Sequence, residues 1–317
     1  MILIVSSVMD AHARCVAQEL EKLGEAVFFL DMSHCGSGTL VEHQIGRSGA
    51  PLTLTTEDGT LINLCEVSAV WHRRPQRPRF PSDLIDIEDR NFANLEWIDA
   101  LDSLLLSIDA RHMNPLWSQR AALKPRQLEI ARRLGLRIPA TLVTNDPLRV
   151  NEFLTMHRNN VVYKSLTAPN HCFLATRRWS ETDGAALVDL PISPAIFQEE
   201  IIGPSDVRVT IVGQEIFAAR IDTSASRPSS DRQSDVDSRL DLDAPYELHD
   251  LPESIAQLLR ELMSELGLVF GTIDLKITNE GDHVFLEVNP QGQFLYVEIL
   301  TGLPITLAVA RFLAGRS

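Results

Sequence analysis

The stretch GTIDLKITNEGDHVFLEVNP, residues 271–290, decides the fold of this 317-residue chain. Polar and apolar residues alternate with a period of two on both sides of Glu280-Gly281, which predicts two antiparallel strands joined by a tight turn. With those two residues as the loop, Asn279 pairs with Asp282 and Asp274 faces Glu287 directly. The hairpin therefore places two carboxylates side by side.

The facing carboxylates need a positive partner, because like charges at directly opposite strand positions repel one another. Asn289 lies two residues beyond Glu287 and so shares its face of the strand. Two carboxylates and an amide oxygen form an all-oxygen ligand set of the kind that suits Mg²⁺ together with substrate phosphates. The spacing is equally compatible with a solvent-facing polar strand on which Lys276 neutralises the charge.

Two lysines upstream favour a phosphate ligand. Lys124 precedes a predicted helix, and Lys164 lies in an apolar strand. A buried ammonium group is costly unless it meets an anion, and a nucleotide phosphate would supply one. Taken singly, each lysine also fits the ordinary use of charged residues at helix starts and strand ends.

Composition places the chain among globular proteins. It has 29 Lys and Arg against 43 Asp and Glu, a net charge of −14 and 44% hydrophobic residues, which excludes disordered and collagen-like chains. The excess of acid argues against a nucleic-acid partner, because that binding needs clustered cations. The length predicts about two domains, or one α/β enzyme built of lobes.

The sequence also argues against a membrane or secreted protein. No apolar run approaches the roughly 18 residues of a membrane span, and Met1–Val5 lacks the basic segment and cleavage site of a signal peptide. We therefore expect a cytoplasmic protein. The cysteines match no metal-binding spacing and are expected to be reduced, structural thiols: Cys15, Cys35, Cys65 and Cys172.

The first 30 residues read strand, helix, strand, with Asp10 as the helix N-cap and Gly24 after the helix end. The turn at 6–10 contains no glycine, and the chain has no P-loop motif. Dinucleotide-dependent redox chemistry and P-loop chemistry are therefore disfavoured.

A basic motif follows the predicted strand 67–71, which ends in His72-Arg73-Arg74-Pro75. Arginines at a strand end could bind an anion, such as an acidic peptide that Arg239 would also contact. They fit equally well as a solvated basic edge ended by proline.

After Met113-Asn114-Pro115 the pattern restarts as alternating helices and strands, which predicts an α/β protein made of α+β lobes. The segment Thr223–Asp243 has no periodicity and is either a mobile substrate loop or a simple insertion. The elements expected before it are helices at 125–134, 148–157 and 182–190, and strands at 138–144, 161–164, 172–176, 195–201, 206–212 and 215–222.

The order of these motifs along the chain resembles that of the ATP-grasp superfamily over about residues 113–317. Within that superfamily, the sequence most resembles the maturases that make graspetides, the microviridin-like cyclic peptides. The resemblance implies an ATP-grasp fold with an N-terminal pre-ATP-grasp α/β domain at 1–112, a central lobe at 113–195 and a C-terminal lobe at 196–317. It rests on Val70–Pro75, Lys124–Leu128, Arg137–Asp146, Lys164, Phe197–Ile201, Asp206–Gly213, Phe217–Ala219, Asp274 and Glu287–Gln293.

The resemblance also implies roles for individual residues. Lys124 and Lys164 would bind the phosphates of ATP, and Arg208 and Arg220 the transferring phosphate or acyl phosphate. Many microviridin-type relatives have a different residue at position 220. The remaining nucleotide contacts would come from Gln198, Glu199, Glu200, Ile201 and Asp206, and the Mg²⁺ ligands would be Asp274, Glu287 and Asn289. The Glu199-Glu200 pair departs from the commoner Glu-aromatic pair of the family. Phe294 and Tyr296 would either cover the nucleotide or pack in the core.

The implied reaction is ATP-dependent macrocyclisation of a ribosomal precursor peptide with leader and core segments. An Asp or Glu side chain becomes an acyl phosphate, and a Ser, Thr or Lys side chain attacks it to form an ω-ester or ω-amide. A homodimer is the family expectation. The alternatives are a glutathione-synthase or RimK-type ligase, which joins two separate molecules, and a non-catalytic nucleotide-binding protein.

Overall fold

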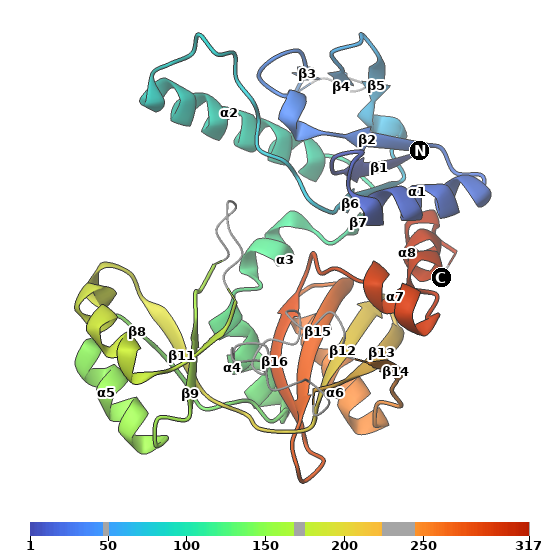
Figure 1. Ribbon diagram of the computed structural model, residues 1–317. Helices are drawn as coiled ribbons and strands as arrows, with labels where there is room; N and C mark the ends of the chain where they lie inside the picture. Colours follow the sequence, from blue (N-terminus) through green and yellow to red (C-terminus); the bar gives the residue numbers. More distant parts are fainter. Residues whose placement is uncertain (47–50, 168–174, 224–244, 317) are drawn as a thin grey trace.

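The computed structural model describes residues 1–46, 51–167, 175–223 and 245–316. Figure 1 shows an N-terminal region in blue at the top, with a green to yellow central lobe and an orange to red C-terminal lobe below it. Each of these regions is built around its own sheet. The α/β organisation therefore agrees with the expectation from the sequence.

A parallel sheet in the order β2-β1-β6-β7 forms the N-terminal region. Helix α1 (Ala11–Lys22) covers one face and α2 (Ile87–Leu106) the other. Asp10 caps α1 as predicted, because its Oδ1 accepts a hydrogen bond from the Ala13 N–H at 2.9 Å. The strands are β1 (Ile2–Val5), β2 (Val27–Leu30), β6 (Ala69–His72) and β7 (Arg111–Met113).

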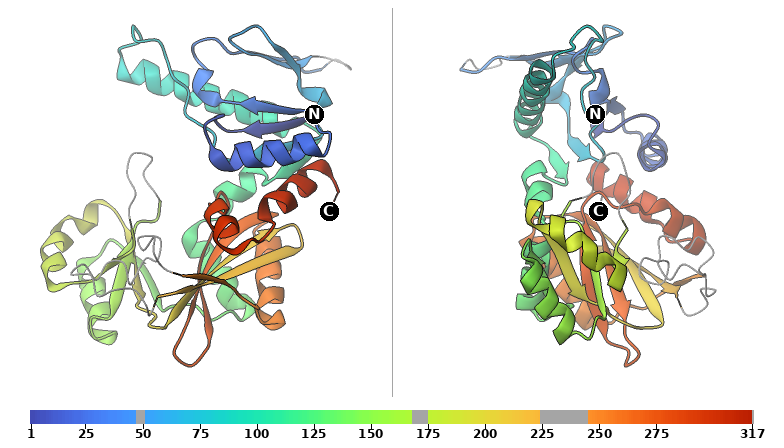
Figure 2. Two further views of the ribbon diagram at one scale, coloured as in Figure 1. Left: turned by 45° about the vertical axis from the view of Figure 1, so that its right-hand side comes forward. Right: turned by 60° about the vertical axis from the view of Figure 1, so that its left-hand side comes forward.

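Helix α8 (Ile305–Ala314) returns from the C-terminal lobe to pack against α1, so both ends of the chain share one core (Figure 2). A separate antiparallel sheet lies at the far edge of the N-terminal region. It consists of β3 (Leu40–His43), β4 (Leu52–Thr55) and β5 (Leu61–Asn63), flanked by the 3₁₀ helices η1 (Met32–His34) and η2 (Leu64–Glu66).

The central lobe is an antiparallel sheet in the order β10-β9-β11-β8. Its small core joins Val150 and Leu154 of the covering helix to Val161 and Phe197 of the sheet. The elements are β8 (Thr141–Thr144), α5 (Pro147–Met156), β9 (Val161–Lys164), β10 (Arg177–Arg178), the 3₁₀ helix η3 (Glu181–Ile192) and β11 (Ala195–Glu199).

The C-terminal lobe is an antiparallel sheet in the order β14-β13-β12-β15-β16. Its α4 and α6 pack on the face that carries Val209, Ala218 and Ile273. The side chains of the residues next to these along each strand point to the opposite face of the sheet. The elements are α3 (Leu116–Ala121), α4 (Lys124–Leu134), β12 (Ser205–Val212), β13 (Glu215–Asp222), β14 (Tyr246–Leu248), α6 (Glu253–Glu265), β15 (Phe270–Ile277), β16 (His283–Asn289) and α7 (Leu295–Thr301).

The β15–β16 hairpin turns through three residues, so the predicted two-residue loop was wrong. The Thr278 N–H, rather than that of Asn279, donates to the carbonyl oxygen of Asp282 at 3.0 Å. Gly281 closes the loop with φ of +90°, a conformation that favours glycine. The turn therefore shifts the register of the nearby pairs by one residue.

A β-bulge restores the predicted pairing of the carboxylates. Leu275 pairs with Phe285, whereas Asp274 pairs with Glu287, so Leu286 is an extra residue on β16. The prediction that Asp274 faces Glu287 is confirmed, although the loop that was used to derive it is different.

Other expectations differ or fall outside the described residues. The strand predicted at 172–176 is found at Arg177–Arg178, and 172–174 are not described. The helix predicted at 182–190 is the 3₁₀ helix η3, which contains Pro191. Most of the Thr223–Asp243 segment, with Arg239, lies outside the described residues, as does Cys172. The described cysteines Cys15, Cys35 and Cys65 are free thiols.

Arg73 is a core residue, so its prediction as part of a solvated edge or a peptide-binding surface was wrong. It is 0% exposed, and its Nη1 donates to the carbonyl oxygens of Gln291 and Gly292. Its Nε lies 3.6 Å from Oδ1 of Asp10, which supplies an anion from within the chain. Arg73 therefore ties the N-terminal sheet to the loop that follows Asn289.

His12 completes this junction and predicts a pH-dependent stability. Its Nε2 accepts a hydrogen bond from the Phe294 N–H at 3.1 Å, and burial, with Arg73 nearby, lowers the pKa of His12 from 6.5 to about 4. The folded state thus binds this proton less well than the unfolded state. We expect the His12 contribution to be present above pH 6.5 and to be lost as the pH falls to 4, by roughly 3 kcal/mol in the free energy of unfolding.

Urea unfolding of the wild type and of His12→Gln between pH 7 and pH 4 measures this contribution. Glutamine keeps an acceptor for the Phe294 N–H but does not titrate, so its unfolding free energy should fall less steeply. Equal slopes for the two proteins would contradict the assignment.

Candidate functional site

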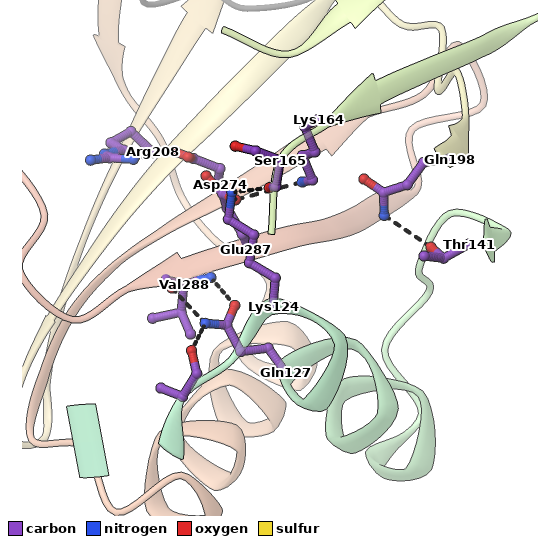
Figure 3. Close-up of polar contacts among 11 residues, drawn as sticks. Lys124, Gln127, Thr141, Lys164, Ser165, Gln198, Arg208, Asp274, Glu287 and Val288 are labelled. Atoms are coloured by element: carbon purple, nitrogen blue, oxygen red, sulfur yellow. Dashed lines mark hydrogen bonds and ion pairs between the residues drawn. The ribbon is translucent and has the colours of Figure 1, made fainter. Parts of the chain in front are cut away.

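Two lysines converge on one carboxylate between the central and C-terminal lobes (Figure 3). Oε2 of Glu287 lies 3.5 Å from Nζ of Lys164 at the end of β9 and 3.7 Å from Nζ of Lys124 at the start of α4. Lys124 also donates to the carbonyl oxygen of Ser165 at 3.2 Å. Both lysines therefore lie beside the same carboxylate of the hairpin.

The second carboxylate of the hairpin has a different partner. Nη1 of Arg208 donates to Oδ1 of Asp274, and its Nη2 donates to the carbonyl oxygen of Gln293 at 3.2 Å. The register of β12, β15 and β16 places Arg208, Asp274 and Glu287 in one row. Asn289 lies on the same face, and its Oδ1 accepts a hydrogen bond from the Gln291 N–H.

Lys276 does not neutralise these carboxylates, so that alternative reading of the hairpin was wrong. Its Nζ lies 2.8 Å from Oδ1 of Asp206. Three other cations, from α4, β9 and β12, approach Asp274 and Glu287 instead. The positive partners that the facing carboxylates were expected to need therefore come from elements distant in the chain.

A pocket beside this row is lined by the residues that the resemblance assigned to the nucleotide. Gln198, Glu199, Glu200, Ile201 and Asp206 line it, as the resemblance implied. Its other walls include Val162, Lys164, Lys276 and Leu286, the bulged residue of β16. The pocket therefore runs from the end of β11 to the lysine that approaches Glu287.

Three of the side chains that line this pocket are held by contacts with other residues. Nε2 of Gln198 donates to Oγ1 of Thr141 at 2.9 Å. The Glu199 carboxylate accepts from the Ala140 N–H at 3.0 Å, and Glu200 forms a bidentate pair with Arg178. These contacts fix the strand end that carries the pocket wall.

Arg220 does not lie beside the carboxylates Asp274 and Glu287. It pairs with Val207, whose side chain belongs to the helix-covered face, and its Nε donates to Oγ of Ser205 at 2.7 Å. Phe294 is fully buried in the core, and Tyr296 packs edge to face with Tyr246. Of the two predicted arginines, only Arg208 lies beside the carboxylates.

Gln127 holds the strand segment between the proposed metal ligands. It is buried in α4, its Nε2 donates to the carbonyl oxygens of Ala122 and Val288, and its Oε1 accepts from the Val288 N–H, at 2.7 to 2.9 Å (Figure 3). Val288 lies between Glu287 and Asn289. The helix therefore fixes the backbone from which both side chains project.

Replacing Gln127 with leucine should destabilise the protein. The change leaves buried backbone groups of Val288 and Ala122 without partners, and each such group costs about 1–3 kcal/mol. We expect roughly 3 kcal/mol less unfolding free energy in urea titrations. Arg126→Leu, on the exposed neighbouring position, should change it by less than about 0.5 kcal/mol. Equal effects of the two variants would contradict the role of Gln127.

Comparison with known proteins identifies the family. A model of the MvdD pre-ATP grasp domain matches residues 1–120. The crystal structure of macrocyclase MdnC bound with precursor peptide MdnA, from Microcystis aeruginosa MRC, is 30% identical, with a TM-score of 0.85 and 98% of both chains covered. The chain belongs to the graspetide macrocyclase family of ATP-grasp ligases.

Two further structures are similar to this graspetide-family ligase over nearly its whole length. Macrocyclase MdnB from Microcystis aeruginosa MRC is 30% identical, with a TM-score of 0.81 and 98% of both chains covered. A RiPP-associated ATP-grasp ligase from Chryseobacterium gregarium, in complex with ADP and a leader and core peptide, is 26% identical, with a TM-score of 0.89, covering 100% of this chain and 97% of that one. No curated protein matches significantly.

The family assignment confirms the ATP-grasp fold and the N-terminal pre-ATP-grasp domain that the sequence predicted. Within the described ranges, no helix is long and apolar enough to cross a membrane. Among those same residues, no group of three His, Cys, Asp or Glu side chains gathers in a way that could hold a metal ion. A metal at this ligase site would therefore depend on two carboxylates and the amide oxygen of Asn289.

The side chains present fit a nucleotide with its metal. Lys124, Lys164 and Arg208 carry three positive charges against two negative charges on Asp274 and Glu287. A net positive site favours a polyanion, and adjacent carboxylates favour the divalent cation that accompanies it.

Sequence reasoning missed Gln127, Asn114 and the internal partner of Arg73. Asn114 is buried, donates to the carbonyl oxygens of Phe270 and Pro290, and accepts from the N–H groups of Val269 and Phe270. A polar residue on an apolar helix face, or just before a helix-breaking proline, was the available signal. It did not identify the partners of Asn114 or the Val288 partner of Gln127, which lie more than 150 residues away in the chain.

Proposed function

We propose that this graspetide-family ligase is an ATP- and Mg²⁺-dependent macrocyclase of a ribosomal precursor peptide. The supporting observation is the convergence of Lys124 and Lys164 on Glu287, beside the pairing of Arg208 with Asp274. Similar macrocyclases provide the substrate class, a precursor peptide. The reaction activates an Asp or Glu side chain of the peptide and links it to a second side chain.

The residues of this chain position the reactants and neutralise their charge. Lys124 and Lys164 bind the ATP phosphates, and Gln198–Ile201 with Asp206 surround the base. Arg208 holds the phosphoryl group that passes to the peptide carboxylate, because guanidinium matches its oxygens in a bidentate geometry. Asp274, Glu287 and Asn289 would hold Mg²⁺, which would neutralise the phosphate charge. Positioning and charge account for most of catalysis in phosphoryl transfer.

Ring closure then needs only a nucleophile from the same peptide. The attacking side chain forms a bond to the acyl carbon, the bond from carbon to the phosphate oxygen breaks, and inorganic phosphate leaves. No residue of the chain is consumed. The products are ADP, phosphate and a peptide that has lost one water for each ring.

Mass spectrometry of a precursor peptide incubated with the enzyme, ATP and Mg²⁺ tests this proposal. A short reading frame next to the gene that encodes an acidic, Thr-containing peptide would supply the substrate, and its absence would favour the RimK-type alternative. We expect each ring to remove the mass of one water. ATP hydrolysis without dehydration would refute the proposal, and a gain in mass from a second molecule would support the RimK-type alternative. Light scattering tests the predicted homodimer.

A further inference from the structure

Two histidines from opposite edges of the C-terminal sheet meet away from the ligase site. His249 follows β14 and His283 begins β16, and these two strands are the edges of the five-stranded sheet (Figure 1). Their Nε2 atoms lie 3.1 Å apart. His283 shares a strand face with Phe285, which packs under the helices, so the pair lies on the face opposite to Glu287.

The spacing of the two nitrogens matches that of a metal-bound pair. Zn²⁺ lies about 2.0–2.1 Å from imidazole nitrogens, so two such ligands of one ion are roughly 2.9–3.4 Å apart at square-planar to tetrahedral angles. The observed separation of 3.1 Å is within this range. The ring planes are inclined at 39°, and a tilt of both rings directs the two Nε2 lone pairs at one ion between them.

Both imidazoles are in the protonation state that a metal requires. Burial lowers the pKa of each histidine, and His283 and Arg220 lower that of His249 further, whereas Asp250 raises it. The rings are therefore neutral at physiological pH. In their hydrogen bond one Nε2 carries a proton and the other accepts it. Moving that proton to Nδ1 of the same ring makes both Nε2 atoms available without changing the charge of either ring.

The surroundings allow water to complete the coordination of an ion. His249 and His283 are both half-buried. The other close histidine pair differs, because His72 is 1% exposed and Nε2 of its partner His112 is 3.2 Å from a backbone carbonyl oxygen. A metal at that enclosed pair would lack further ligands, whereas one at His249 and His283 can take water molecules.

We propose that His249 and His283 bind one divalent transition-metal ion of the class that prefers imidazole, such as Zn²⁺ or Cu²⁺, and that this ion joins β14 to β16. Mg²⁺ prefers oxygen ligands, so the histidine pair and the carboxylates of the ligase site select different ions. With two side-chain ligands the site exchanges its ion with solution, unlike a closed four-ligand site. The inference goes beyond the proposed function and does not depend on it.

Calorimetric titration of the untagged enzyme with Zn²⁺ alone gives the first test. We expect one ion per chain, and at least tenfold weaker binding in His249→Ala and in His283→Ala, because loss of even an outer-shell partner has an effect of this size. His43→Ala, at an exposed strand position, is the control for loss of a histidine. Glu287→Gln should bind Zn²⁺ as the wild type does, since an ion at the ligase site would be weakened by that change. Absence of Zn²⁺ binding, or equal binding in the wild type and both alanine variants, would overturn the inference.

Cobalt spectroscopy tests coordination directly in a variant that keeps a ligand. His283→Cys replaces an imidazole with a thiolate, which also binds this class of metal. Co²⁺ bound to the variant should show a thiolate-to-cobalt charge-transfer absorption that is missing from the wild type, which has the same other cysteines. A folded His283→Cys protein without this absorption at saturating Co²⁺ would contradict coordination by position 283.

Thermal unfolding tests whether the ion joins the two strands. An ion that binds the folded state raises the midpoint of unfolding, and we expect a rise of about 3 °C at a Zn²⁺ concentration ten times its Kd. Neither alanine variant should show this rise. Zn²⁺ binding to the pair without a rise would refute the link between the strands. These measurements need neither ATP nor a peptide, so they decide the metal site separately from the macrocyclase function.

Discussion

Glu287→Gln should reduce ATP-dependent turnover about 10³-fold or more while leaving the fold intact. The amide has the shape of the carboxylate but no charge. Oε2 of Glu287 lies within 3.7 Å of both lysine ammonium groups, so the change removes their common anion and one proposed Mg²⁺ ligand. ADP release and peptide dehydration measure the activity, and thermal unfolding checks the fold.

Asp282→Asn is the matched control, because it makes the same chemical change on the same hairpin. Asp282 is exposed and pairs with Arg137, away from the lysines. We expect its activity to stay within about twofold of wild type, since exposed ion pairs contribute little. Retention of ATP-dependent activity in Glu287→Gln would refute the assignment of this carboxylate.

The local pattern of the hairpin was sufficient to predict which of its polar residues share a face. Alternation alone placed Asp274 opposite Glu287 and Asn289 on the same face, and the structure has both features. The loop was predicted one residue too short, yet the bulge at Leu286 cancels the error at the carboxylates. Sequence alternation identifies which residues share a face, but it does not show where a bulge interrupts the ladder.

The long-range partners could not be derived in this way. Lys276 is the nearest cation in the sequence to Asp274, but it pairs with Asp206, and the positive charges come from Lys124, Lys164 and Arg208. Which cation meets which carboxylate depends on the packing of three elements. Local context singled out Lys124 and Lys164 as possible phosphate ligands and the resemblance to a family added Arg208, but neither showed which carboxylate each cation meets.

The same limit explains why the sequence did not distinguish the two arginines on neighbouring strands. Both looked suited to a phosphate, because guanidinium binds phosphate well and both lie in the strand pair that precedes the hairpin. The register of β12 and β13 places Arg208 opposite Ala219 and Arg220 opposite Val207, which puts their side chains on different faces. The alternation of side chains along each strand shows that Arg208 and Arg220 lie on different faces only when the pairing of the two strands is known.

Arg208→Met is therefore expected to abolish most activity through loss of phosphate stabilisation, by about 10³-fold in turnover. Arg208 also pairs with Asp274, so a metal at that carboxylate would share it with the guanidinium. Removing the guanidinium leaves the carboxylate more available to a cation. We expect Mn²⁺, titrated in the presence of ADP and followed by electron paramagnetic resonance, to bind at least as tightly as in the wild type.

This separation of turnover from metal affinity distinguishes Arg208 from the carboxylates beside it, because Asp274→Asn should weaken both. Arg220→Met provides the comparison on the other face of the sheet and should reduce turnover by less than tenfold. An equal loss in Arg220→Met and Arg208→Met would contradict the placement derived from the strand register. Weaker Mn²⁺ binding in a folded Arg208→Met protein would instead show that the guanidinium supports the metal site, rather than competing for its carboxylate.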